Sequence, residues 1–195
     1  MPEAATDYAW LDMDNIRAFM RATEFLLDLG HQKIALITGH KSMDFARRRR
    51  IGFEEGLRAH GISVEPSLMT SGEMTETFGY QSTKRFLSLN KALTAILVSS
   101  ILLAFGVQCA ISEADLQMGK DISVVMHDDA LSYLQNGGVV PLFTSTRSSV
   151  REAGRRCAEL LIERVNSPID HLVQELWEAE LILGQSTGRA PSAPS

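Results

Sequence analysis

Residues 29–39 read LGHQKIALITG, and this stretch decides the fold class. Its central part, residues 33–38, is a short apolar run without alternating polar positions, which is typical of a strand buried on both faces of a parallel sheet. Two further runs, residues 94–98 (TAILV) and 121–126 (DISVVM), have the same character. Segments of helical periodicity separate these runs, and the alternation predicts an α/β fold with a largely parallel sheet.

The helices are predicted from apolar residues that recur every three or four positions. Asp14 or Asn15 can cap the first helix, and Gly30 ends it. On this pattern the chain opens with a helix, whereas a doubly wound domain usually opens with a strand, so we expect an earlier part of the fold to be missing. The remaining predicted elements are helices over residues 47–60, 76–87, 102–114 and from 148 or 149 onward, a strand over 67–71, and extended structure over 172–183.

The charge balance bears on the class of partner. The 19 basic and 24 acidic side chains give a formal net charge of −5, whereas a domain that holds a DNA duplex by itself is expected to carry a basic surplus. The 45% hydrophobic and 22% charged residues are typical of a globular domain, and no apolar run approaches the ~18–20 residues of a membrane span. The start, MPEAATDYAW, lacks the basic and apolar regions of a secretory signal, so we expect a cytoplasmic protein.

The sequence gives little indication of a metal site, a cofactor site or a catalytic site. Cys109 and Cys157 lie far apart, without a CxxC pair and inside apolar helical patterns, which predicts two buried free thiols. The five histidines are scattered, so no zinc site is expected. Phosphate-binding and dinucleotide-binding glycine motifs are absent, and so is a nucleophile elbow, so we predict no cofactor and no enzyme.

The polar loops after the predicted strands are the candidate binding site, because ligands of open parallel sheets bind outside the carboxyl ends of the strands. These loops are residues 39–46, 99–101 and 127–141. The first leads into Arg47-Arg48-Arg49-Arg50, whose guanidinium groups could bind a phosphate or carboxylate or could form a solvated face with ion pairs. Successive helical residues are turned by about 100°, so at most two of the four can face a ligand, with Arg47 nearest the loop.

The third loop carries His127-Asp128-Asp129 directly after a strand. A carboxylate at Asp128 could accept hydrogen bonds from sugar hydroxyls or a ring N–H, or could cap the next turn. His127 could act as a general base, but no Ser or Cys nucleophile motif accompanies it. Met74 follows a strand exit and could line a cleft or fill the core.

Taken in order, several motifs resemble the LacI/GalR family of bacterial transcription regulators. The match runs over about residues 12–188, nearly the whole chain, and its segments keep the family's order and spacing. The matching segments are Asp14-Asn15, residues 29–37 (LGHQKIALI), Arg49 with Gly52, Phe53 and Leu57 (RxxGFxxxL), Gly79-Tyr80, residues 94–96 (TAI), 104–106 (AFG), 121–125 (DISVV) with Asp128-Asp129, Pro141-Leu142, Thr144, Gly154, Leu160-Leu161 and Ser186-Thr187.

The resemblance implies a two-lobed sensor domain, similar to type I periplasmic binding proteins, whose cleft binds a sugar, nucleoside or related metabolite. In such regulators a helix-turn-helix head reads operator DNA and the sensor forms a homodimer. The resemblance implies that the head and the first half of the N-terminal lobe lie outside this chain. The resulting assignment is 1–15 as a lead-in from the N-terminal lobe, 16–147 as the C-terminal lobe, 148–170 as a helix of the N-terminal lobe, 171–188 as closing strands and 189–195 as a disordered tail.

The same resemblance gives a set of effector-binding residues. Arg47 would take the place of an effector-contacting arginine, Asp128 that of the carboxylate after the DISVV strand, and Ser99 that of a polar contact. Met74 stands where an aromatic wall is frequent, and Asp44 and Phe45 complete the set from the first loop. Helices 76–87 and 102–113 would supply part of the homodimer contact.

Several positions depart from the family pattern, so the resemblance does not indicate a standard hexose as effector and leaves open a degenerate cleft. Three other functions stay open on the sequence alone: a sugar-binding protein of a transporter, an α/β enzyme, and a gene fragment without a working cleft. The departures are Ser99-Ser100, Met126, His127, Val150 and Gly184.

Overall fold

The computed structural model describes residues 8–89, 92–131, 133–166 and 172–192. Its main body is built on a six-stranded sheet of order β3-β2-β4-β5-β6-β8, in which only β8 is antiparallel to its neighbour. A separate parallel pair joins β1 and β7. The strands are β1 (Trp10–Met13), β2 (Ile34–Gly39), β3 (Met69–Gly72), β4 (Ala95–Val98), β5 (Ser123–Asp128), β6 (Thr144–Arg147), β7 (Gln174–Trp177) and β8 (Glu180–Ile182).

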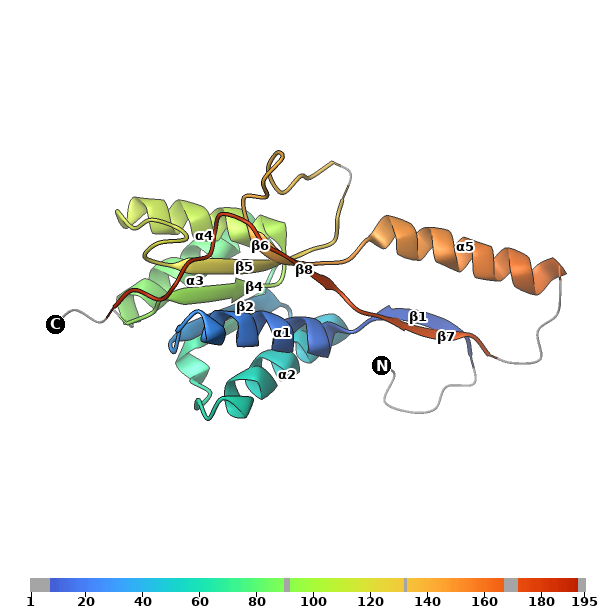
Figure 1. Ribbon diagram of the computed structural model, residues 1–195, viewed down its shortest axis with the longest axis horizontal. Coiled ribbons are helices and arrows are strands. Elements are labelled where there is room, and N and C mark those ends of the chain that lie inside the picture. The colour runs from blue at the N-terminus through green and yellow to red at the C-terminus, as the bar shows by residue number, and fades with distance from the viewer. Residues whose placement is uncertain (1–7, 90–91, 132, 167–171, 193–195) are drawn as a thin grey trace.

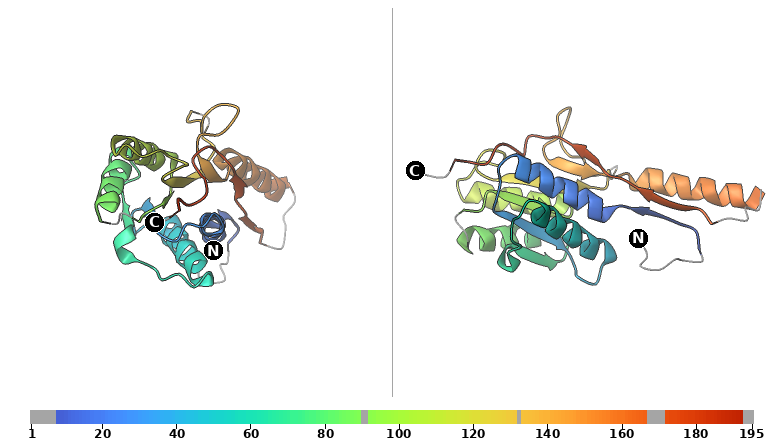
Figure 2. Two further views of the ribbon diagram at one scale, coloured as in Figure 1. Left: turned by 60° about the vertical axis from the view of Figure 1, so that its left-hand side comes forward. Right: turned by 60° about the horizontal axis from the view of Figure 1, so that its bottom comes forward.

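Helices cover both faces of the six-stranded sheet (Figures 1 and 2). α1 (Asn15–Asp28) and α2 (Asp44–Ala59) pack on one face, and α3 (Glu76–Leu89) and α4 (Ile101–Glu113) pack on the other. A short 3-10 turn, η1 (Pro66–Leu68), precedes β3. None of the helices in the described ranges is long and apolar enough to cross a membrane.

The alternation of side chains along β2 divides the core into two layers. Leu36 packs with Phe19 and Phe53 beneath α1 and α2, whereas Ile37 packs with Phe86 beneath α3 and α4. All these side chains are almost completely buried. Burying each large apolar side chain contributes about 1.5–3 kcal/mol, so the body holds the groups at the strand ends on a rigid base.

A smaller unit, made of β1, β7 and α5 (Val150–Asn166), extends beyond the carboxyl ends of the parallel strands (Figure 1). Arg156 of α5 donates to Glu175 of β7 with Nη2 to Oε1 at 2.7 Å, which ties the helix to the pair of strands. No residue of α5 is buried. We call β1, β7 and α5 the outlying unit, and the rest the sheet body.

The predicted strands and helices are mostly confirmed, but the expectation that the chain opens with a helix is wrong. β1 precedes α1, and β6 lies between the predicted loop and the last predicted helix, where no element was predicted. The polar sequence TSTR of β6 gives no hydrophobic signal, although the strand is mostly buried; the hydroxyls of Thr144 and Thr146 are hydrogen-bonded within the body.

Two element boundaries differ in a way that concerns the site. α2 begins at Asp44, so Asp44 and Phe45 lie in its first turn rather than in a loop. β5 continues to Asp128, so His127 and Asp128 belong to the strand rather than to the loop after it. The capping prediction for α1 is confirmed, because Asp14 accepts a hydrogen bond from the backbone N–H of Arg17.

The prediction of two buried thiols is wrong, since Cys109 and Cys157 are both exposed. α4 is apolar nearly all round, so its sequence does not reveal which side faces solvent, and nothing covers α5 in the described chain. In the predicted tail, Ala190 lies against the body, because its N–H donates to the carbonyl of Leu29. Residues 193–195 lie outside the described ranges.

Candidate functional site

The candidate site lies at the carboxyl edge of the sheet, where the ends of β2 and β4 are neighbours. The helix after β2, α2, lies on one face of the sheet, and the helix after β4, α4, lies on the other. In open α/β sheets the crevice at such a switch point is the usual ligand site. Figure 1 shows this edge facing the outlying unit.

Arg49 is the central charged group of this edge. Its side chain is almost fully buried; Nε donates to Asn15 Oδ1 at 2.7 Å and Nη1 donates to the carbonyl of Ser99 at 2.7 Å. Burial lowers the pKa of Arg49 to about 10, an effect that the nearby carboxylate of Asp129 opposes. A guanidinium carries five N–H donors, so these two bonds leave donors for a further partner.

Two aromatic rings hold the Arg49 guanidinium in place. Its central carbon lies 4.8 Å from the ring centroid of Phe45 and 5.4 Å from that of Phe19. Contacts of this type stabilise a cation by about 0.5–2 kcal/mol and fix the plane of the guanidinium. Phe45 is partly exposed, so the same ring that supports Arg49 also presents apolar surface at the edge of the sheet.

His127, which is buried beside Phe19, and the partly exposed Asp129 form a second cluster. His127 Nδ1 bonds to the hydroxyl of Thr146 at 3.0 Å, and Nε2 bonds to that of Ser148 at 3.1 Å. Burial, together with the charge of Arg49, lowers the pKa of His127, so the ring is neutral at pH 7. Because both ring nitrogens are engaged, the histidine serves the arrangement of β5 and β6 rather than acting as a free base.

Asp129 faces this cluster, with Oδ1 3.3 Å from His127 Nε2. Burial acts to raise the pKa of Asp129, but the hydrogen bond from His127 and the positive charge of Arg49 outweigh it, so the pKa is lowered. The carboxyl edge thus holds an ionised carboxylate and a buried cation near each other, which suits a ligand with both donor and acceptor groups.

Of the predicted site residues, the structure brings Phe45 and Met74 together over Gly39. A Cβ atom at Gly39 would lie 3.1 Å from the Phe45 ring and 3.5 Å from Met74 Sδ, so the missing side chain lets these two approach the strand end. Together they form an apolar wall beside Arg49.

The side chains of Ser99 and Asp128 form hydrogen bonds within the body. The Ser99 hydroxyl has no exposed surface and donates to Thr38 Oγ1 at 2.8 Å, so Ser99 supports Arg49 through its carbonyl rather than reaching a ligand directly. Asp128 Oδ1 accepts the N–H of Ala130 at 2.8 Å, which corresponds to the turn-capping alternative. Asp128 also lines a pocket of about 390 Å³ beside β6 and β8.

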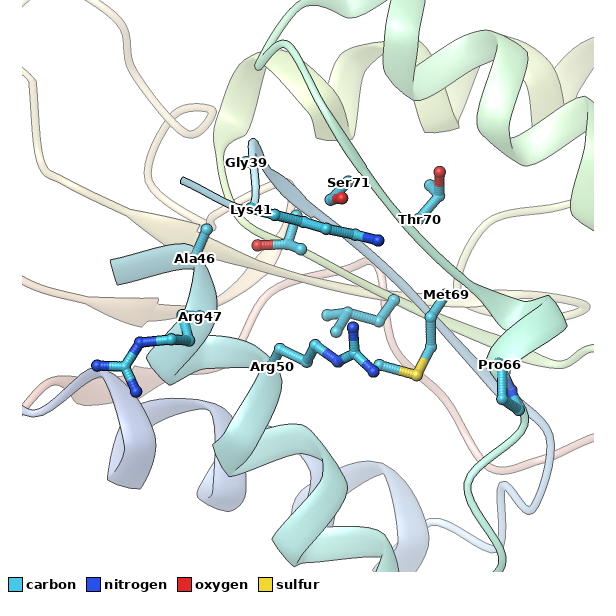
Figure 3. A pocket seen from close by; sticks show the side chains of 11 residues that line it. Gly39, Lys41, Ala46, Arg47, Arg50, Pro66, Met69, Thr70 and Ser71 are labelled. Atoms are coloured by element: carbon cyan, nitrogen blue, oxygen red, sulfur yellow. The ribbon is translucent and has the colours of Figure 1, made fainter. Parts of the chain in front are cut away.

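Arg47 and Asp44 lie elsewhere on α2. Arg47 Nη2 lies 2.9 Å from Asp44 Oδ1, and both side chains are about half-exposed. Arg47 lines another pocket, of about 530 Å³, between α2 and β3, and Figure 3 shows its guanidinium pointing away from Lys41 and Arg50. The expectation that Arg47 and Asp128 share one crevice is therefore not met, because they line different pockets.

Arg49 is a candidate site residue that the sequence analysis did not select. The four consecutive arginines cannot be ranked by composition, and nearness to the loop favoured Arg47. The available signals were the RxxGF motif, in which Arg49 is the arginine, and the helical spacing that places Arg49 one turn after Phe45. Among the described residues, no group of three or more His, Cys, Asp or Glu side chains could hold a metal ion.

The family model of a periplasmic binding protein-like domain matches residues 23–187. The chain belongs to this family, and the resemblance to LacI-type regulators is confirmed. The HTH-type transcriptional regulator AglR of Rhizobium meliloti is 43% identical over 185 residues, which are 95% of this chain and 52% of that protein. The repressor PurR of Haemophilus influenzae is 30% identical over 164 residues, 84% of this chain and 47% of that protein.

Solved structures agree with the sequence comparison. The chain resembles the transcriptional regulator CelR in its cellobiose complex with a TM-score of 0.83 at 25% identity, covering 95% of this chain and 56% of that one. A LacI-family regulatory protein from Chloroflexus aggregans gives a TM-score of 0.83 at 29% identity, covering 95% and 66%. This chain spans about half the length of the curated relatives it matches.

Proposed function

We propose that this chain is the effector-binding and dimerisation part of a ligand-controlled transcription regulator of LacI type, and that its effector is a sugar or related polyhydroxylated metabolite. The effector would lie at the carboxyl edge of the sheet, between the sheet body and the outlying unit. The observation that carries the proposal is the buried Arg49 guanidinium, held at the switch point between Phe45, Phe19 and the carbonyl of Ser99.

The chemistry of the edge supports a polyhydroxylated effector. Sugar hydroxyls both donate and accept, so they can accept from Arg49 and donate to a carboxylate such as Asp128 or Asp129. The apolar faces of sugar rings pack on side chains such as Phe45 and Met74. The related regulator CelR forms a complex with cellobiose, and this supports a sugar as the class of effector here.

The relatives that the chain matches are named as HTH-type regulators, and this supports a regulator over a binding protein of a transporter. We propose that control of an operator uses a helix-turn-helix head and a homodimer in the whole protein, in the cytoplasm and without catalysis. α3 and α4 would supply part of the dimer contact. Leu102, on α4, is the kind of exposed apolar side chain that such a contact covers.

The test is a calorimetric titration of the 195-residue chain with cellobiose, maltose, ribose and adenosine. At least one of them should bind, and Arg49→Lys should weaken that binding at least tenfold, because Lys cannot reproduce the planar pair of donors. Arg155→Gln is the matched control, since Arg155 is an exposed arginine of α5 that, within the described ranges, pairs with Glu159 alone. Equal binding by wild type and Arg49→Lys would remove Arg49 from the site.

DNA binding supplies an independent check. The net charge of −5 predicts that the chain alone binds an operator no better than random DNA of the same length. A specific shift in a gel assay would contradict the assignment of DNA reading to a separate head.

A further inference from the structure

A second pocket, of about 530 Å³, lies beside α2 at the β3 edge of the sheet. Its floor is Leu36 of β2 and Met69 of β3, which are paired in register and lie on the same face of the sheet. Its volume falls within the ~300–1,000 Å³ range of small-molecule sites. Figure 3 shows Lys41 and Arg50 reaching across it from opposite sides.

The lining of this pocket is basic. Lys41 and Arg50 contribute positive charges to it, and none of the residues that line it is acidic. Arg50 Nε donates to Glu54 at 2.7 Å, but Arg58 binds the same carboxylate through its other oxygen at 2.9 Å, so two cations share one anion. Among the described residues, Lys41 has no ion-pair partner.

Two hydroxyls complete the polar part of the pocket. Thr38 and Ser71 are paired in register at the ends of β2 and β3, on the same face as Leu36 and Met69. Thr38 Oγ1 accepts the hydroxyl of Ser99, which leaves its own O–H to donate. The strand ends therefore offer hydroxyl donors next to the two cations.

We propose that this pocket binds the phosphate group of a small phosphorylated metabolite, at a site separate from the effector crevice. The Arg50 guanidinium suits two phosphate oxygens, Lys41 supplies a compact charge, and the hydroxyls of Thr38 and Ser71 donate to the remaining oxygens. Leu36, Met69 and Pro66 form an apolar surface for the carbon part of the ligand.

The proposal does not depend on the effector site. Arg49 and Arg50 are neighbours on α2, but Arg49 is buried against Ser99 and Phe19, whereas Arg50 is about half-exposed and lines the pocket at β3. Successive helical side chains point about 100° apart, so α2 can direct Arg49 toward the effector site and Arg50 toward the pocket at β3.

The experiment is a calorimetric titration of the 195-residue chain with glycerol 3-phosphate, inorganic phosphate and glycerol at constant ionic strength. We expect glycerol 3-phosphate to bind at least as tightly as inorganic phosphate, and glycerol not to bind. Lys41→Gln and Arg50→Gln should each weaken phosphate binding roughly tenfold, because each removes a charged donor. Ser71→Ala should have a smaller effect.

Arg155→Gln is the matched control, since it removes one positive charge from α5, away from the pocket. An equal loss in Arg155→Gln would show general electrostatic attraction and would overturn the proposal. So would unchanged affinity in both Lys41→Gln and Arg50→Gln, or the absence of binding of either phosphate compound. Weaker binding of glycerol 3-phosphate than of inorganic phosphate would overturn the assignment to a metabolite. Thermal unfolding of each variant without ligand checks that the fold is kept.

Discussion

The sheet body and the outlying unit differ in how they are held together. In the sheet body, both faces of the parallel strands are covered, and side chains such as Phe53 and Phe86 are completely buried. In the outlying unit, α5 buries none of its residues, and its apolar Leu161, Ile162 and Val165 are mostly exposed. The body is thus stabilised by packing, whereas the outlying unit depends on strand pairing and ion pairs. The proposed effector site lies on the side of the packed body.

The largest effect should come from the core of the body. Phe53→Ala should destabilise the chain by about 3–5 kcal/mol, because it leaves a cavity beneath α2 that the packed strands cannot close. Denaturant unfolding followed by circular dichroism measures this loss. A cost below ~1 kcal/mol would mean that the body is not packed as described.

The next effect concerns the close contact of α1 and α2. A Cβ atom at Gly52 would lie 2.1 Å from the carbonyl oxygen of Ile16, so Gly52→Ala forces the two helices apart. We expect a loss of about 1–3 kcal/mol in the same unfolding experiment. Gly154→Ala on α5 is the matched control, because nothing lies within 4 Å of the added atom. A Gly52→Ala variant that is more stable than the wild type would contradict the close contact of α1 and α2.

The free energy of unfolding should depend on pH through His127, near the boundary between the two regions. Burial lowers the pKa of His127 in the folded chain, so the unfolded chain binds a proton more readily, and stability is lost as the pH falls below the unfolded value of about 6.5. His31 is also buried with a lowered pKa and contributes in the same direction. The loss between pH 7.5 and pH 5.5 should be smaller in His127→Gln than in wild type. An identical pH dependence in both proteins would contradict a buried, neutral His127.

The smallest effect should come from the outlying unit. Leu161→Ala should change the free energy of unfolding by no more than about 0.5 kcal/mol, because the side chain is 65% exposed and belongs to neither core cluster. The Phe53→Ala variant, measured in the same experiment, gives the larger loss expected for a side chain in the core of the sheet body. A loss of 2 kcal/mol or more would mean that α5 packs against the chain in solution.

The strands could be predicted from the sequence where their buried positions are occupied by apolar residues. The runs at residues 34–39 and 95–98 became β2 and β4, because strands covered on both faces need uniformly apolar side chains. β6 could not be found in this way, since its polar TSTR sequence is buried through hydrogen bonds to distant residues such as Thr187 and His127. Cys109 was placed wrongly because α4 is apolar on its exposed side as well.

The candidate site was predicted in position but not in detail. The carboxyl edge follows from the parallel sheet alone, and Phe45 and Met74 do meet there. The sequence does not predict which of the four adjacent arginines is buried beside Phe19, because the packing of α2 against α1 decides it. For this reason the sequence analysis selected Arg47 and not Arg49. The residues that line the basic pocket at β3 come from three separate segments of the chain, so no local sequence pattern predicts this pocket.

The most direct measurement is a crystal structure of this chain with whichever sugar binds in the calorimetric panel. We expect a sugar hydroxyl within about 3.2 Å of an Arg49 guanidinium nitrogen, with the ring against Phe45 or Met74 at the carboxyl edge of the sheet. A sugar bound instead on the surface of α3 and α4, or out of reach of Arg49, would contradict the proposed effector site.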